Sequence, residues 1–457
     1  MSEIPPRAKS VAVPTGRIAR FGHISSLTAN VAGNMALGAL LQLGHGQRPV
    51  MKDLLLTPRN ITQVTDKLSK MRGAAMKIGQ LVSMDTGDIL PPELTQIMAR
   101  LRDNASAMPP AQLKQVLNAQ LPTGWLASVR KFDVRPIAAA SIGQVHRAVL
   151  KDGRELALKI QYIGVADSID SDVANVGVLI KMSGLLPSEF ELAPYLEEAR
   201  KQLHDETDYV REAAQINHFR NLLKDTPQFV IPAVHRDWST PKILAMDYMT
   251  GVPIENVASA PQAIKDQVIT DLITLALREL LEFGVMQTDP NFANYLYEPK
   301  ARKLILLDFG AARAIAPTVA LQYRQLIYAG LENNVDNLTA AAQKMGIFDG
   351  TTRYAHRMRI VQMLRQVFDM IRDGGAIDFT DQTISKQLQA EGMALFADGF
   401  SPPLVPVDIL LIQRKFAGLF LLGARLGAKV NVGEILHRRL GYSQSDKATT
   451  KTPHKRS

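Results

Sequence analysis

The chain has 457 residues, and its hydrophobic content of 46% is enough for two or three domains of ordinary size with sizeable cores. It contains no cysteine, which excludes disulfides, thiol nucleophiles and cysteine-based zinc sites. The net charge is +9, and much of the excess lies in two ends that we expect to be flexible, a basic arm at 1–20 and a Ser/Thr-rich tail at 441–457. Such basic ends could bind anionic lipid or nucleic acid. No nucleic-acid-binding motif accompanies them, so we expect no nucleic-acid partner.

Residues 21–125 are expected to form a helical extension. Its first helix, Phe21–Gln47, has no Asp, Glu, Lys or Arg and is long enough to span a bilayer. Polar residues and glycines interrupt it, so we interpret it as a helix at a membrane surface or a subunit interface. Small residues at four-residue spacing would permit a homodimer there. The alternative is packing on the protein's own core, and no transmembrane pair is expected near the C-terminus.

A long helix is expected around residues 60–84, where Lys77 and Gln80 lie three apart on one face. The basic arm lacks the apolar core of a secretory signal, so the expected location is cytoplasmic, with peripheral contact at the inner face of a membrane.

Residues 126–249 are predicted to form a nucleotide-binding lobe. The run Ala138-Ala139-Ala140-Ser141-Ile142-Gly143-Gln144-Val145 fits the phosphate-covering loop Gly-x-Gly-x-x-Gly-x-Val, although only Gly143 keeps a glycine. A hairpin follows, with its turn at Asp152-Gly153. Its second strand carries Lys159, which matches the lysine that pairs with the α and β phosphates. The alternative is a solvated lysine at a sheet edge.

Such a lysine needs a carboxylate on a packed helix, and a helix is predicted from Ala193 to Leu223. Asp208 and Glu212 share a face of it and repel each other unless a cation intervenes, so Lys159 is the expected partner of Glu212. Glu206 should face something else. The alternative is a solvated acidic face.

Two further elements complete this lobe. A helical insertion is expected at about 165–186. The strand 242–246 leads into Asp247-Tyr248-Met249, where a kinase connects its lobes and presents its backbone to adenine.

Residues 250–440 are predicted to form a helical lobe that carries the metal and phosphate end of the site. Asp289 and Asn294 precede the apolar strand 303–307, which ends in Asp308-Phe309-Gly310. This order, on a loop and a strand, is typical of a protein-kinase-like site. The alternative is a buried strand that ends in a polar turn.

Together these residues resemble the UbiB / AarF-domain family of atypical kinases, over nearly the whole chain, and particularly its mitochondrial branch, which supports coenzyme Q biosynthesis. The residues that carry the resemblance are Lys77-Ile78-Gly79-Gln80, the Ala-rich loop 138–145, Lys159, Glu206-x-Asp208-Tyr209 with Glu212, Asp289 with Asn294, and Asp308-Phe309-Gly310. Many members have a histidine where Gln287 stands and His-Pro-Gly where Asn291-Phe292-Ala293 stand. The aspartate and asparagine are kept, so we expect metal binding to be kept and the rate to be affected.

The resemblance implies an α+β fold, an atypical protein-kinase-like pair of lobes with an N-terminal helical extension. It implies ATP and Mg²⁺ as cofactors, ATPase activity, a role in quinone-lipid biosynthesis and poor protein phosphorylation. Isoprenoid-lipid intermediates or an anionic membrane are the expected partners besides nucleotide.

In this interpretation Asn294 and Asp308 would hold Mg²⁺, and Asp289 would take a proton from the attacking hydroxyl or orient a water. We also expect Lys77 and Gln80 to meet Glu206 and Asp208, which would lay the N-terminal helix across the nucleotide lobe; the alternative is a solvated Lys77. Two rival functions remain open, a phosphotransferase for a small molecule or lipid and a nucleotide-gated scaffold.

Overall fold

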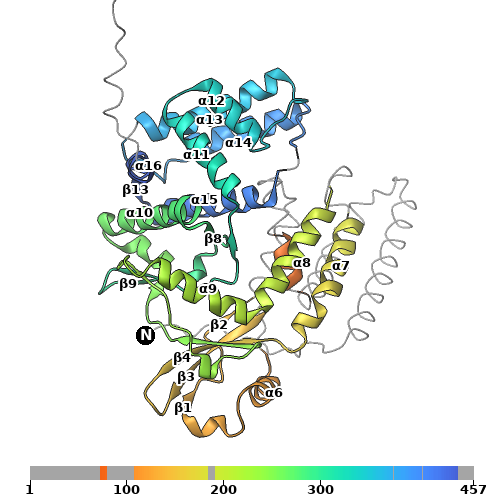
Figure 1. Ribbon diagram of the computed structural model, residues 1–457, viewed down its shortest axis with the longest axis vertical. Helices are drawn as coiled ribbons and strands as arrows, with labels where there is room; N and C mark the ends of the chain where they lie inside the picture. The colour runs from red at the N-terminus through yellow and green to blue at the C-terminus, as the bar shows by residue number, and fades with distance from the viewer. Residues whose placement is uncertain are drawn as a thin grey trace, which may run out of the picture. The chain divides into compact units, whose positions relative to one another are not determined.

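The computed structural model describes residues 71, 73–79, 108–140, 142–183, 191–373, 375–403 and 405–440. They form two compact units (Figure 1). The first takes the described residues up to Arg220 together with Pro232–Met249, and the second takes Asn221–Ile231 and the described residues from Thr250 onward. The expectations for the basic arm, the helix Phe21–Gln47, Gln80, Ser141 and the tail lie outside the described residues.

The first unit is built on an antiparallel sheet of order β1-β3-β4-β6, with β2 paired to β3. Its strands are β1 (Val129–Phe132), β2 (Ala138–Ala139), β3 (Gly143–Leu150), β4 (Glu155–Gln161) and β6 (Ile243–Asp247). Its helices are α6 (Pro110–Gln120), η3 (Trp125–Ser128), α7 (Val165–Ser183), α8 (Ala193–Thr207), α9 (Tyr209–Leu222) and η4 (Arg236–Trp238).

The predicted hairpin is confirmed as β3 and β4, which pair along their length. At the turn, the amide of Leu150 donates to the carbonyl of Arg154 at 2.8 Å. Gly153 has a φ of +95°, in the left-handed region that glycine adopts without steric cost. The Asp-Gly signal therefore marks the turn correctly.

The side chains of β4 point alternately to the hydrophobic core of the unit and to α9. Leu156, Leu158 and Ile160 are fully buried in a cluster with residues of α6 and with Trp238. Because successive side chains of a strand point to opposite faces, Lys159 lies on the other face, where it meets α9.

The helix predicted from Ala193 to Leu223 is wrong in one respect, because it breaks at Asp208 into α8 and α9. Asp208 has a ψ of 84°, outside the helical region, and its carboxylate accepts from the amide of Arg211 at 2.9 Å. Aspartate satisfies the first amides of a helix well, so it acts here as the N-cap of α9. The insertion predicted at 165–186 is confirmed as α7, which packs beside α8 (Figure 1).

The second unit is mainly helical, and its short strands form one sheet of four strands and two of two strands. Its strands are β5 (Phe229–Val230), β7 (Val252–Pro253), β8 (Val285–Gln287), β9 (Tyr295–Glu298), β10 (Lys303–Leu306), β11 (Ala312–Ala314), β12 (Ile377–Asp378) and β13 (Lys429–Val430). Its helices are η5 (Ile254–Ser259), α10 (Gln262–Arg278), the π-helical η6 (Glu279–Phe283), η7 (Phe292–Asn294), α11 (Pro317–Leu331), α12 (Val335–Lys344), α13 (Tyr354–Asp373), α14 (Thr383–Ala397), α15 (Val407–Leu426) and α16 (Val432–Leu440).

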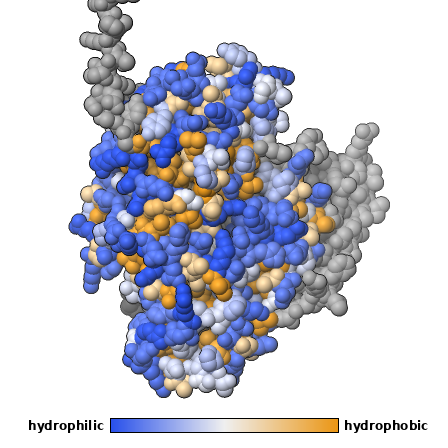
Figure 2. All heavy atoms as spheres, viewed as in Figure 1, coloured by the Kyte–Doolittle hydropathy of each residue, from blue (hydrophilic) through white to orange (hydrophobic). Residues whose placement is uncertain are grey.

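Helices α10 and α15 pack side by side in the core of this unit (Figure 1). Ile269 and Ala276 of α10, and Ile412 and Leu422 of α15, are fully buried. Among the described residues no helix is long and apolar enough to cross a membrane. Figure 2 shows hydrophobic residues in separate patches among hydrophilic ones, an ordinary pattern for a protein surface.

Candidate functional site

In the first unit, the predicted site residues include a buried ion pair between Lys159 of β4 and Glu212 of α9. The ammonium of Lys159 donates to both carboxylate oxygens of Glu212, at 2.8 and 3.0 Å. It also lies 5.5 Å from the ring centroid of Tyr209. Glu212 is fully buried, and a buried charge is tolerated only when it is paired and hydrogen-bonded. The partner predicted for Glu212 is therefore confirmed.

The Ala-rich loop lies next to this strand, and its glycine has a packing role. Ala138 and Ala139 form β2, which pairs with Val145 and Gln144 of β3. A Cβ at Gly143 would come within 2.3 Å of the carbonyl oxygen of Ile160 in β4. Gly143 is therefore needed for the pairing of β3 with β4, a role that the sequence motif alone did not indicate.

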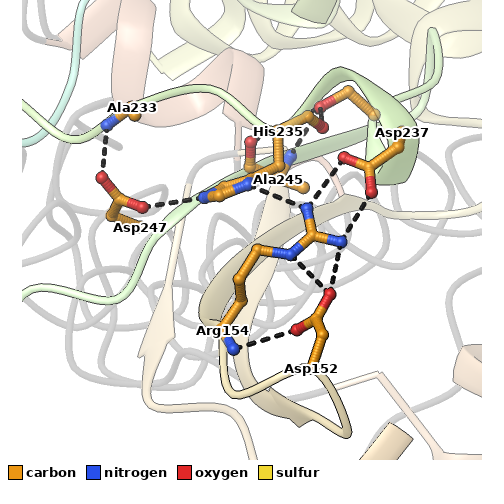
Figure 3. Close-up of polar contacts among 8 residues, drawn as sticks. Asp152, Arg154, Ala233, His235, Asp237, Ala245 and Asp247 are labelled. Atoms are coloured by element: carbon orange, nitrogen blue, oxygen red, sulfur yellow. Dashed lines mark hydrogen bonds and ion pairs between the residues drawn. The ribbon is translucent and has the colours of Figure 1, made fainter. Parts of the chain in front are cut away.

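The predicted lobe connection begins at the end of β6, where the side chain of Asp247 is held inside the first unit (Figure 3). One carboxylate oxygen accepts from the amide of Ala233 at 2.8 Å, and the other lies 2.8 Å from Nε2 of His235. Nδ1 of His235 faces the guanidinium of Arg154 at 3.2 Å. Arginine has only donors, so Nδ1 accepts and Nε2 donates to Asp247.

Arg154 in turn joins the β3–β4 turn to the segment before β6 (Figure 3). Its guanidinium pairs with Asp237 through two hydrogen bonds, at 3.1 and 2.8 Å, and with Asp152 at 2.8 Å. The hydrogen bonds from Arg154 lower the pKa of both carboxyl groups. The amide of Tyr248 is also engaged, by the carbonyl of Glu155 at 2.9 Å. These contacts fix the backbone that leads to Met249, and nucleotide binding by Asp247 and Met249 stays a prediction for that backbone.

In the second unit, four strands bring the other predicted residues together. β8 pairs with β11, and β9 pairs with β10, so the loop after β8 and the turn after β10 emerge close to each other. The amide of Leu307 donates to the carbonyl of Asn294 at 3.0 Å, which sets Asn294 beside the start of Asp308-Phe309-Gly310. Thr288 donates through its hydroxyl to the carbonyl of Ala311 at 3.0 Å, which joins the two loops.

The carboxylate of Asp289 is held from two sides. One oxygen accepts from the side-chain amide of Asn294 at 3.0 Å. The other faces the guanidinium of Arg414 on α15 at 3.7 Å. Asp308 closes its own turn by accepting from the amide of Gly310 at 2.9 Å, and Phe309 is buried.

Asn294 and Asp308 fit the requirements of a Mg²⁺ site. Asn294 donates its amide hydrogen to Asp289, so its amide oxygen is the atom that could bind a cation. Mg²⁺ prefers hard oxygen ligands and is commonly held by one or two side chains together with substrate phosphates. Within the described ranges, no three His, Asp or Glu side chains converge on a metal site of their own.

The predicted contact of Lys77 in the N-terminal extension with Glu206, which lies on α8, is present. Lys77, in the helical residues 73–79, forms an ion pair with Glu206 near the end of α8, and both side chains are largely buried. Asp208 does not share this contact, because it is exposed and caps α9. Gln80 lies outside the described residues.

In the second unit, two cations that the sequence did not single out lie beside the loop that carries Asp289, namely Arg414 and Lys415 of α15. Lys415 is fully buried and donates to Gln287 at 3.0 Å and to the hydroxyl of Tyr295 at 2.7 Å. The available signal was two adjacent cationic residues in an otherwise apolar helical stretch. Lysine is rarely buried unless it has a partner, so a lysine there indicates a specific contact.

Comparison with known proteins places these features in a family. The model of the ABC1 atypical kinase-like domain matches residues 100–342. The chain is 38% identical to the atypical kinase COQ8, mitochondrial, of Saccharomyces cerevisiae, over 95% of this chain and 87% of that protein. It is 35% identical to the atypical kinase COQ8B, mitochondrial, of Rattus norvegicus, over 93% of this chain and 80% of that protein.

A solved structure supports the same conclusion about the fold. A complex of Rv3197 with erythromycin from Mycobacterium tuberculosis superposes with a TM-score of 0.59 at 26% identity, over 82% of this chain and 94% of that one. Together with the match to the ABC1 kinase-like domain, this superposition confirms the expected kinase-like α+β fold.

Proposed function

The chain belongs to the ABC1 atypical kinase-like family, and from that premise we propose that it binds Mg-ATP and hydrolyses it in support of coenzyme Q or related quinone-lipid biosynthesis. The observation that carries the proposal is the buried ion pair of Lys159 with Glu212. Phosphoryl transfer asks mainly for positioning and charge neutralisation, and a lysine held by a helix carboxylate supplies both.

Each residue has a defined task in this proposal. Lys159 orients the α and β phosphates, and Asp247 and Met249 present backbone to the adenine. Asn294 and Asp308 hold Mg²⁺, which when bound neutralises charge on the phosphate oxygens. Asp289 orients the attacking water, or accepts the proton of a hydroxyl, with its carboxylate held by Asn294.

Hydrolysis is favoured over protein phosphorylation because the nucleotide lobe carries an additional helical segment. Lys77 and Glu206 attach residues 73–79 to α8, and we infer that this segment restricts the approach of a polypeptide substrate. Water or a small lipid head group would still have access.

We further propose that the protein works at a membrane as a peripheral protein. The basic arm and the uncharged segment Phe21–Gln47 support this, because cationic residues next to an apolar helix bind anionic lipid. The same segment offers small residues for a homodimer. The relatives from yeast and rat are named as mitochondrial proteins, and we propose for this chain a place at the inner face of a membrane.

The test is deletion of the gene in its host, with quinone lipids profiled and rescue attempted by the wild-type chain and by Asp289→Asn. Loss of quinone that only the wild-type chain restores supports the proposal, and unchanged quinone lipids contradict it. Purified protein should release phosphate from ATP, faster with membranes present. A phosphorylated lipid or small molecule would identify a phosphotransferase instead, and nucleotide binding without turnover would identify a scaffold.

A further inference from the structure

Helix α15 lies directly against the loop that carries Asp289. A Cβ at Gly418 would come within 2.3 Å of the Cβ of Pro290, the residue after Asp289. Glycine at this position therefore allows the helix backbone to touch the loop. At the start of α15, Asp408 pairs with Arg313 of β11 at 3.7 Å, which ties the same helix to the strand after Asp308-Phe309-Gly310.

Lys415 joins the two ends of this loop. Its ammonium donates to the side-chain oxygen of Gln287, the last residue of β8, at 3.0 Å. It also donates to the hydroxyl of Tyr295, the first residue of β9, at 2.7 Å. Everything from 288 to 294, including Asp289 and Asn294, lies between these two attachment points.

Lys415 and Glu279, in the π-helical η6, are both buried and act on each other through their charges, although Lys415 forms its hydrogen bonds with Gln287 and Tyr295. Burial raises the pKa of Glu279 to about 7, and Lys415 acts in the opposite direction. Burial alone would lower the pKa of Lys415, but Tyr295 and Glu279 raise it above its ordinary value, so its ammonium stays charged. Taking a cation out of water is costly, so stability alone does not explain why a buried lysine stands here.

Arg414, the residue before Lys415, holds the loop from its polar side. Its guanidinium faces one oxygen of Asp289 at 3.7 Å, while Asn294 donates to the other at 3.0 Å. A carboxylate held at both oxygens has a defined orientation. Adjacent residues of α15 thus reach the two strand ends that flank the loop and the carboxylate of Asp289 within it.

We propose that α15 is the positioning element of the phosphoryl-transfer loop, with Lys415 and Arg414 as positioning residues that hold Asp289 and Asn294 in their working geometry. The inference rests on the proposed function, in which Asp289 acts on the attacking group. Displacement of a reacting group by about 1 Å can cost about a hundredfold in rate, so such supports affect turnover more than binding.

The experiment compares Lys415→Met, the double variant Lys415→Met/Glu279→Gln, Arg414→Gln and Arg414→Lys in the full chain. Arg425→Met is the matched control, because it removes a cation from an exposed position of the same helix. ATP hydrolysis gives kcat and KM, thermal unfolding gives Tm, and hydrogen exchange reports on the amides of Thr288 and Asn294, which donate to the carbonyls of Ala311 and Asn291.

We expect the double variant to lose less Tm than Lys415→Met alone, because it does not leave the buried carboxyl group of Glu279 without the nearby cation. Its kcat should fall about 10- to 100-fold, with KM for Mg-ATP changed by less than about threefold. The amides of Thr288 and Asn294 should exchange faster, Arg414→Lys should retain more turnover than Arg414→Gln, and Arg425→Met should match the wild type.

A folded double variant with wild-type kcat and wild-type exchange would overturn the proposal. If the double variant does not fold, Tyr295→Phe decides, since it removes one hydrogen bond of Lys415 and keeps the ring. Wild-type kcat in both Tyr295→Phe and Arg414→Gln would then overturn it. The variant Asp289→Asn distinguishes failure of the proposed function from failure of the positioning role. Full turnover in that variant contradicts the proposed function. An inactive Asp289→Asn beside fully active α15 variants contradicts only the positioning role.

Discussion

Lys77 and Glu206 form an ion pair in which the two side chains are only 8% and 17% exposed. This ion pair joins the N-terminal extension to α8 within the first unit. A partly buried pair of this kind is screened less by salt than a surface pair. We therefore expect that removal of either side chain loosens the attachment of residues 73–79 to α8.

Lys77→Ala and Glu206→Ala should each alter ATP hydrolysis and speed hydrogen exchange in residues 73–79. The double variant should be non-additive, with an interaction energy of about 0.5–3 kcal/mol, because the two side chains contact each other. Lys201→Ala, an exposed lysine on α8, serves as the control. Strict additivity in both hydrolysis and exchange would mean that the pair does not hold the segment.

Asp308→Asn should abolish the stabilisation of the protein by Mg-ATP and Mg-ADP. In the wild type, nucleotide at 100 times Kd should add about 2.7 kcal/mol to the free energy of unfolding, measured by thermal-shift titration. Asp336→Asn, an equal charge change at an exposed position of α12, should keep the full shift. An undiminished shift for Asp308→Asn would remove this residue from the metal site.

Lys159→Ala should weaken or misorient nucleotide, and it should also destabilise the apoprotein. Removal of one partner from a buried pair costs about 3–5 kcal/mol, because Glu212 would lose the cation that donates to both its oxygens. Lys159→Met/Glu212→Gln should recover much of the Tm without recovering hydrolysis. Recovery of hydrolysis in that double variant would show that the lysine is structural only.

Ala138→Gly or Ala140→Gly should change the preference between ATP and ADP and raise autophosphorylation, because glycine allows closer backbone approach to phosphate than alanine does. The measurements are incorporation of labelled phosphate and binding of both nucleotides. Ala127→Gly, an exposed alanine outside the loop, is the control. Unchanged preference and labelling would identify the alanines as tolerated substitutes.

Glu279 should make stability depend on pH between about 4.5 and about 7, its ordinary and its folded pKa. Burial raises the pKa, so the folded protein binds the proton more tightly than the unfolded chain. The contribution is therefore full below the lower value and is lost as pH rises through the higher one, by up to about 1.4 kcal/mol per pH unit. Burial lowers the pKa of His146, so this residue makes stability rise with pH, opposite to the effect of Glu279. The measurement is therefore the difference in unfolding free energy between the wild type and Glu279→Gln, from denaturant titrations at each pH. Parallel pH profiles would contradict the assignment.

Turn chemistry and the partners of buried charges were predictable from the sequence, whereas contacts that depend on how the helices pack were not. The hairpin at Asp152-Gly153 follows from turn chemistry, and the match of Lys159 with Glu212 follows from the need to pair a buried charge. The break at Asp208 was missed because helical periodicity continues through it, although an aspartate ahead of Arg211 and Glu212 is a usable N-cap signal.

The roles of Arg414, Lys415 and Gly418 could not be read from the sequence. They depend on which face of α15 meets the loop after β8, and that is decided by packing in the whole unit. The same holds for Gly143, which looks like part of a phosphate loop in the sequence and proves to be required by the neighbouring strand.

The attachment of Lys415 to Gln287 and Tyr295 spans 128 and 120 residues of chain. During synthesis the polypeptide emerges from its N-terminal end, so the loop with Asp289 is made well before the helix that holds it. A nascent chain, or one cut short ahead of Val407, would carry every residue of the Asp289 and Asp308 motifs and still lack their support. If α15 positions the loop, competence for chemistry would thus come only after residues 407–426 have been made.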